Sequence, residues 1–327
     1  MPEEPRLPPP TAVRIDAAAG CQLRCPLCPV TTGATHAVVG TGALKAQAFE
    51  TFLDANPSVR LVELANSGEA VLNTALPEIL RIAHARGVTT RFDQGVNLNH
   101  VAAEALEAMV TCGTDRVRVS IDGATQATYG RYRVRGDLRQ VLRHIQILNG
   151  FKRQHGSTTP ELVLQFIVFG HNEHELDAIE LMARGLGMRL ELRLNWSTET
   201  FPVSDRDALR ARIGAADRAE HRSRTGRHYS ASQCLHLWHA PQINWDGKLL
   251  GCGRNRWGAF ADDALGPRFQ EAFNGVAIAH ARDIVRGRAT PREDAPCRQC
   301  GVYTAMVADG RYLTDDDVAA GADGVWA

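Results

Sequence analysis

Three cysteines stand close together near the N-terminus, at a spacing suited to a metal cluster. Cys21, Cys25 and Cys28 form the pattern CxxxCxxC within the segment GCQLRCPLCP. Three thiolates on one short loop can bind three irons of a 4Fe-4S cube, which leaves the fourth iron open for a small molecule to coordinate. A zinc site is the alternative, although zinc sites usually have four ligands and paired two-residue spacings.

Four further cysteines lie in the last third of the chain: Cys234, Cys252, Cys297 and Cys300. Asp246-Gly247 stands between two apolar runs and predicts a hairpin turn, with Cys234 and Cys252 at the ends of the hairpin and the CxxC pair opposite. Four thiolates either ligate every iron of a second 4Fe-4S cluster or hold one zinc ion in a structural ribbon. Both alternatives predict a small domain built around a metal centre.

Three further residues give weaker indications of chemistry: the remaining cysteine, Cys112, and two histidines close to Cys234. Cys112 is predicted to be a buried small side chain, and a thiol that donates hydrogen in an epimerisation is the alternative. His236 and His239 follow Cys234 closely and are predicted to bond within the hairpin. A role as base or ligand is the alternative. No catalytic base is assigned.

The elements that must position these residues follow a repeating pattern. Strands are predicted at 13–17, 60–65, 88–93, 116–121, 162–169 and 188–194, and helices at 45–54, 77–86, 100–110, 138–152 and 173–186. Alternating strands and helices indicate parallel strands, and ligands of such folds gather at the carboxyl ends of the strands. Six units are too few for a closed eight-stranded barrel.

The chain is predicted to divide into five segments. These are a disordered lead-in at 1–11, a βα domain at 12–200, a helical linker at 201–228, a cysteine-rich domain at 229–313 and a loose tail at 314–327. The 327 residues contain 37 basic and 37 acidic side chains, so no basic field favours a nucleic acid as partner. Neither a signal peptide nor a membrane span is evident, which predicts a cytoplasmic protein without a membrane partner.

The first cysteine motif, placed after the first strand of a βα repeat, resembles the radical S-adenosylmethionine superfamily. The resemblance covers nearly the whole chain and implies an α/β fold with a six-unit partial (βα) barrel and the 4Fe-4S cluster at its mouth. It also implies that S-adenosylmethionine binds the open iron and is reductively cleaved to methionine and a 5'-deoxyadenosyl radical, which abstracts hydrogen from a substrate. A reducing flavodoxin or ferredoxin is the implied electron donor.

The ends of other strands extend this resemblance. Ser67, Gly68 and Glu69 resemble a Gly-Gly-Glu turn that binds the methionine amino group, with serine replacing the first glycine. Ser120 and Asp122 are similar to a Ser-x-Asp-Gly segment near the cofactor. Arg133 best fits an arginine that pairs with the cofactor carboxylate. The alternatives are a plain turn, a strand-end cap and a solvated basic loop, respectively.

The C-terminal cysteines resemble the auxiliary-cluster region called SPASM or, in its shorter form, twitch. The resemblance implies one auxiliary 4Fe-4S cluster in a small C-terminal domain with a β-hairpin, and a fully ligated cluster favours electron transfer and hence a two-electron dehydrogenation. A sugar-like or other small polar substrate is expected. The alternatives are modification of a peptide, of the ribosomal or sulfatase type, a redox-neutral epimerisation or decarboxylation, and a non-catalytic iron-sulfur or zinc-binding protein.

Overall fold

A single parallel β-sheet organises the computed structural model, which describes residues 6–197 and 199–324. The strands are β1 (Ala12–Ile15), β2 (Leu61–Glu63), β3 (Thr89–Val96), β4 (Arg116–Ser120), β5 (Glu161–Val168), β6 (Arg189–Leu194) and β7 (Gln242–Ile243). Their order in the sheet is β6-β5-β4-β3-β2-β1-β7, and every neighbouring pair is parallel. The sheet therefore places the carboxyl ends of all its strands at one edge.

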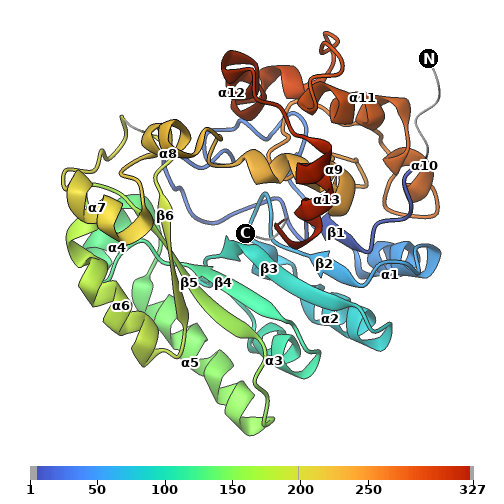
Figure 1. Cartoon of the computed structure of the whole chain (residues 1–327). Helices are drawn as coiled ribbons and strands as arrows, with labels where there is room; N and C mark the ends of the chain where they lie inside the picture. Colours follow the sequence, from blue (N-terminus) through green and yellow to red (C-terminus); the bar gives the residue numbers. More distant parts are fainter. Residues whose placement is uncertain (1–5, 198, 325–327) are drawn as a thin grey trace.

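Helices connect the strands and cover one face of the sheet (Figure 1). They are α1 (Ala46–Ala55), α2 (Leu76–Ala85), α3 (Ala103–Thr111), α4 (Gln126–Tyr132), α5 (Leu138–Gln154) and α6 (Leu176–Gly185), with short 3-10 turns at Ala70–Leu72 and Glu173–Glu175. Their apolar residues recur at helical spacing; in α2, for example, Leu76, Ile79 and Leu80 are fully buried. Burial of these stripes against the sheet forms the main hydrophobic core.

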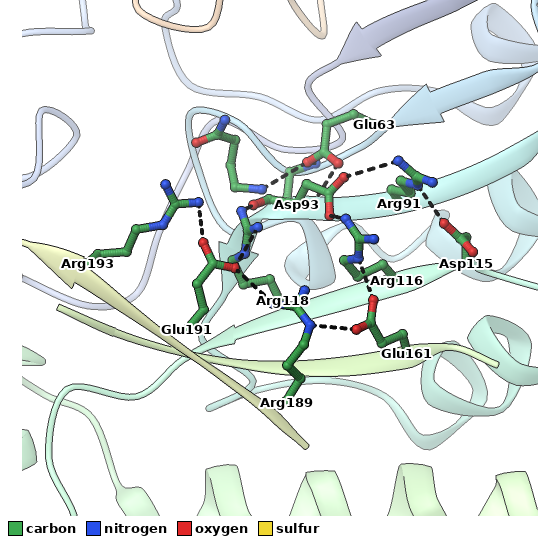
Figure 2. A network of polar contacts seen from close by, with 12 residues as sticks. Glu63, Arg91, Asp93, Asp115, Arg116, Arg118, Glu161, Arg189, Glu191 and Arg193 are labelled. Atoms are coloured by element: carbon green, nitrogen blue, oxygen red, sulfur yellow. Dashed lines mark hydrogen bonds and ion pairs between the residues drawn. The ribbon is translucent and has the colours of Figure 1, made fainter. Parts of the chain in front are cut away.

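The two faces of the sheet have opposite character because side chains alternate along a strand. Val117 and Val119 of β4 point to the core under the helices. Arg116 and Arg118, which alternate with them, belong to a network of charged side chains that crosses β2 to β6 on the other face (Figure 2). The concave side of this sheet is consequently lined largely with charged side chains.

The C-terminal third folds beside β1 (Figure 1). It contains α7 (Arg206–Ile213), α8 (Arg218–Thr225), a 3-10 turn at Ala231–Leu235, α9 (His236–His239), β7, α10 (Phe269–Phe273), α11 (Val276–Val285), a 3-10 turn at Pro296–Gln299, α12 (Gly301–Asp309) and α13 (Asp315–Gly324). The helical linker predicted at 201–228 corresponds to α7 and α8. No helix within the described residues has the length and apolar character needed to cross a bilayer.

All six predicted strands are present within a few residues of their expected bounds, and so are the five predicted helices. The six predicted strands form the sheet as expected, and β7 adds a seventh strand by pairing with β1. The predicted turn at Asp246-Gly247 is present, since the Gly247 N–H donates to the Asn244 carbonyl and an antiparallel bridge joins Ile243 to Leu249. The first arm of the expected hairpin is thus also the seventh strand.

The predictions for the two chain ends fare differently. The loose tail expected at 314–327 is wrong for its described part, because Asp315–Gly324 forms α13, which packs on the segment around Leu235 and His239. Of the predicted lead-in, residues 1–5 lie outside the described residues. The Leu7 N–H donates to the side-chain oxygen of Asn274 at 2.8 Å, so this part of the lead-in contacts α10 and its C-terminal end.

An aromatic contact joins the helices that cover the sheet to the C-terminal third of the chain, and it allows a test of stability. Phe52 of α1 and Phe269 of α10 are buried and pack edge to face with ring centroids 5.3 Å apart. Phe52→Ala removes this contact and leaves a cavity, so we expect it to lower the free energy of unfolding by about 3–5 kcal/mol. Chemical denaturation under anaerobic conditions measures the loss. Leu181→Ala, at a side chain that is 67% exposed, serves as the control and should change stability little.

Candidate functional site

A cavity of about 550 Å³ opens at the carboxyl ends of the strands. Its wall includes the three N-terminal cysteines and residues that follow β2, β3 and β6. Segments from the C-terminal third, 229–236 and 253–256, supply part of the remaining wall. The cavity is within the range of small-molecule sites. Segments that are far apart in the sequence therefore meet around one cavity.

The loop after β1 brings Cys21, Cys25 and Cys28 to this cavity. Its backbone is held by a hydrogen bond from the Cys28 N–H to the Cys25 carbonyl at 3.0 Å, and it is anchored by Leu23, which is buried against aromatic side chains. Burial, the charge of Glu69 and the other two thiols raise the pKa of Cys21 to about 12. The three sulfur atoms are thus close enough to influence one another, as a shared cluster requires.

Glu69 lines the cavity and is buried, and its two carboxylate oxygens have different surroundings. Its Oε2 accepts hydrogen bonds from the backbone N–H of Asn97 at 2.8 Å and from the Asn97 side-chain amide. The other oxygen, Oε1, is buried and has no hydrogen-bond partner among the described residues. Burial raises the pKa of Glu69 to about 8. Because a buried carboxylate oxygen without a donor is costly, this oxygen is suited to a cationic ligand.

Gly68 and Ser67 place Glu69 there. A side-chain carbon at Gly68 would lie 2.4 Å from the Ala18 carbonyl oxygen, so only glycine allows this close approach to the loop before Cys21. The Ser67 hydroxyl donates to Asp16 at 3.2 Å, and its backbone N–H donates to the same carboxylate at 2.8 Å. Serine at this position thus connects the end of β2 to the end of β1.

Two functional residues were missed by the sequence analysis. Asn97, at the end of β3, bonds Glu69 and also donates its amide to the Cys21 sulfur at 3.7 Å. Asp16 accepts from Ser67 and from the Gln242 side chain at 3.0 Å, which joins the ends of β1, β2 and β7. Asp16 directly follows the observed β1 but lies inside the predicted strand 13–17, and Asn97 lies beyond the predicted end of β3 at residue 93. A survey of the residues that follow the predicted strands would therefore have missed both.

Asp122 and Arg133 form a buried ion pair behind the cavity wall. The Arg133 Nε donates to Asp122 at 2.6 Å, and another nitrogen of the same guanidinium lies 3.8 Å from the Cys25 sulfur. Asp122 also accepts from the Ile167 N–H at 2.8 Å. Arg133 lines the cavity, whereas Asp122 does not. The carboxylate therefore orients the arginine, which is the group that can reach a ligand.

Ser120 lines the cavity, and its hydroxyl accepts a hydrogen bond from the Gln165 amide at 3.2 Å. A side-chain carbon at neighbouring Gly95, whose φ is +99°, would lie 2.5 Å from the Ser120 hydroxyl. All six cofactor-binding residues predicted from the sequence, Ser67, Gly68, Glu69, Ser120, Asp122 and Arg133, thus lie in or directly behind one wall of the cavity.

The four C-terminal cysteines converge away from the cavity wall. Burial raises the pKa of Cys234 strongly, and the charges of Cys252, Cys300 and Cys297 raise it further. The pKa of Cys297 is raised to about 12 by burial and by two of the same neighbours. A thiolate here requires compensating positive charge, which metal coordination provides. Among the described residues, no His, Cys, Asp or Glu group is arranged tightly enough to hold a single metal ion.

The three other candidates of the sequence analysis lie at different distances from the cavity, and only His236 lines it. His236 lines the cavity, and its Nδ1 accepts from the Gly253 N–H at 3.2 Å, as expected for bonding within the hairpin region. His239 instead lies 2.7 Å from the Val318 carbonyl of α13. Cys112 ends α3 and is not part of the described cavity wall.

The Asp122–Arg133 pair generates a prediction. Asp122→Asn leaves a buried guanidinium without its carboxylate, so we expect a loss of about 3–5 kcal/mol in the free energy of unfolding. Asp54→Asn is the matched control, because Asp54 also accepts from an arginine Nε, at 2.7 Å, but is exposed. Urea denaturation should show a much smaller loss for Asp54→Asn. Equal losses would show that burial of the first pair is unimportant.

Comparison with known proteins supports the fold. The chain matches no protein-family profile and no curated protein sequence. Streptococcus suis SuiB aligns over 94% of this chain and 76% of its own, at 11% identity and a TM-score of 0.64. BtrN, solved in complex with AdoMet and 2-DOIA, aligns over 89% of this chain and 92% of its own, at 11% identity and a TM-score of 0.48. HydG, a maturase of the [FeFe]-hydrogenase, aligns over 96% of this chain and 82% of its own, at 10% identity and a TM-score of 0.45. The likeness to SuiB shows that the two chains share their fold over most of their length.

Proposed function

We propose that the protein is a radical S-adenosylmethionine enzyme. The observation that supports this most directly is the meeting, in one cavity, of three thiols on one loop with a buried carboxylate oxygen that has no partner among the described residues. Cys21, Cys25 and Cys28 would hold a 4Fe-4S cluster. When bound, such a cluster supplies the electron that cleaves S-adenosylmethionine into methionine and a 5'-deoxyadenosyl radical.

The wall residues fit the charges of the methionine group. Glu69 Oε1 would accept from the ammonium, since it is buried and lacks another donor. Arg133, held by Asp122, would bind the carboxylate. Gly68 keeps the backbone free of a side chain next to the cysteine loop. These residues orient the cofactor relative to the open corner of the cluster and exclude water from one side of it.

The C-terminal cysteines would hold an auxiliary 4Fe-4S cluster. Four thiols can ligate all four irons, which leaves no iron for substrate and favours electron transfer. The cavity wall does not include these cysteines among its described residues, yet Gly253 to Arg256 directly follow Cys252 and line the cavity. We therefore propose a net two-electron oxidation of a substrate bound in the cavity. The 5'-deoxyadenosyl radical would take one hydrogen atom, the resulting substrate radical would lose a proton, and the auxiliary cluster would accept the second electron. A flavodoxin or ferredoxin would supply the initial electron.

Metal and product analysis tests this function. Anaerobically reconstituted protein is expected to contain about eight irons and eight sulfides per chain. With dithionite and S-adenosylmethionine it should release 5'-deoxyadenosine. Zinc without sulfide, or failure to cleave the cofactor, would refute the proposal.

Cysteine variants separate the two clusters. The triple variant C21A/C25A/C28A should lose about four irons and all cofactor cleavage. The double variant C297A/C300A should lose a similar amount of iron but still cleave S-adenosylmethionine. Cys112→Ala is the control and should keep the full iron content. If the double variant retained its iron, the auxiliary cluster would be excluded at these residues.

Glu69→Gln tests the proposed ammonium contact. Loss of the charge should weaken binding of S-adenosylmethionine by roughly tenfold or more, because charge-assisted hydrogen bonds contribute about 1.5–3 kcal/mol. Anaerobic equilibrium dialysis measures the affinity. Glu78→Gln, at a side chain that is 56% exposed on α2, should bind the cofactor normally. Unchanged affinity in Glu69→Gln would remove this residue from the cofactor site.

A further inference from the structure

Positive charge is concentrated around the cavity although the chain as a whole is neutral. The chain has 37 basic and 37 acidic residues. The described wall contains seven arginines and only two carboxylates, Glu69 and Asp93; the arginines are Arg14, Arg118, Arg133, Arg193, Arg218, Arg254 and Arg256. Such an excess at the wall of a hollow focuses a positive potential inside it.

Some of these arginines are neutralised by known partners. Arg133 pairs with Asp122, and Arg118 pairs with Glu191 at 2.9 Å. Arg193 also pairs with Glu191, at 2.5 Å (Figure 2). Arg118 and Arg193 belong to the ionic network of the concave face, and Arg133 has its own buried carboxylate, so the charge of these three arginines is balanced within the protein.

Arg218 and Arg254 have no carboxylate partner among the described residues. Both guanidiniums donate to the same hydroxyl, that of Ser230, at 3.4 Å each. The Nε of Arg254 is buried and has no hydrogen-bond partner among the described residues. Two positive groups therefore converge on one point of the cavity wall without a carboxylate from the described residues to balance them, an arrangement that is unfavourable unless a neighbouring thiolate or a ligand supplies negative charge.

Arg218 is held rigidly at this point. It begins α8, donates through Nε and Nη2 to the Leu194 carbonyl at the end of β6, and lies 4.4 Å from the centre of the Tyr229 ring. Burial and the neighbouring guanidiniums of Arg254 and Arg193 lower the pKa of Arg218 to about 10. The arginine still carries its charge at neutral pH, and its orientation is fixed before any ligand arrives.

The positive charges of Arg254 and Arg218 have different surroundings, which indicate different roles. Arg254 follows the auxiliary ligand Cys252 closely, and its charge also favours the thiolate of that cysteine. Arg218 instead contacts the end of β6, Ser230 and two aromatic rings, those of Trp196 and Tyr229. Its charge is therefore left for the cavity itself.

We propose that the substrate is an anion, with a phosphate or carboxylate group bound by Arg218, Arg254 and the Ser230 hydroxyl. This inference rests on the proposed function and narrows its substrate class: a sugar-like substrate would be a sugar phosphate or sugar acid, and a peptide substrate would present an acidic group here. Guanidinium pairs suit both oxyanions, because they donate parallel hydrogen bonds to two oxygens.

Anaerobic calorimetry on the reconstituted protein tests the proposal with inorganic phosphate, succinate and neutral glycerol. Saturating S-adenosylmethionine is present throughout, so the cofactor occupies its own carboxylate site. We expect phosphate or succinate to bind at least tenfold more tightly than glycerol, and the preferred anion identifies phosphate or carboxylate as the recognised group. Equal binding of all three, or no binding of either anion in the presence of the cofactor, would overturn the proposal.

Variants locate the anion. Arg218→Gln and Arg254→Gln should each weaken its binding roughly tenfold or more, whereas Arg218→Lys should retain part of the affinity. Arg224→Gln removes one positive charge from the outer side of the same helix, where the side chain is 56% exposed, and should change affinity less than twofold. If Arg218→Gln does not fold, the anion affinities of Arg254→Gln and Arg218→Lys test the assignment instead. Anion affinity like that of the unmodified protein in those variants would refute the assignment.

These measurements do not depend on turnover. Iron content and release of 5'-deoxyadenosine by the same samples report on the proposed function separately. Protein that cleaves the cofactor but binds no anion would refute only the substrate class. Protein that binds the anion but holds no cluster would refute the enzymatic proposal and leave an anion-binding site.

Discussion

The alternation of side chains along parallel strands is the constraint on which the rest of the structure depends. One face of β4 and β5 carries valine, leucine and phenylalanine against the helices, while the other carries arginine, glutamate and glutamine. Charges on a concave, partly enclosed surface are stable only when they are paired. The ion pairs that cross β3 to β6 meet this need and keep the inner face polar (Figure 2). A hollow lined with polar groups at the strand ends is the result.

This constraint also explains how the two cysteine groups relate to the sheet. The first group lies on the loop that leaves β1, directly at the strand ends, and it lines the hollow. The second group lies in the segments around β7 and the 3-10 turn at Pro296–Gln299. Because β7 pairs with β1, both groups are connected to the same strand, one through its following loop and one through its neighbour in the sheet.

Much of the fold could be predicted from the sequence because the βα repeats are long and strongly periodic. The strands and helices of 12–194 match their expected positions closely. β7 could not be predicted as part of the sheet, because two residues carry no periodicity and its partner lies more than 220 positions earlier. The helix of Asp315–Gly324 was missed since aspartate and glycine are weak helix formers, and its packing on the segment around Leu235 and His239 stabilises it. The cysteine motif located the candidate site, whereas Asn97 and the arginines of the wall come together only through the tertiary fold.

The pairing of β7 with β1 has a consequence for how the chain can be divided. In isolation, the segment 12–200 would expose the backbone N–H and C=O groups of β1 along an open edge, a surface prone to intermolecular association. It would also deprive Asp16 and Arg14 of Gln242, which bonds both side chains. The C-terminal third is therefore an integral part of the sheet, and the chain is expected to fold as one cooperative unit rather than as independent modules.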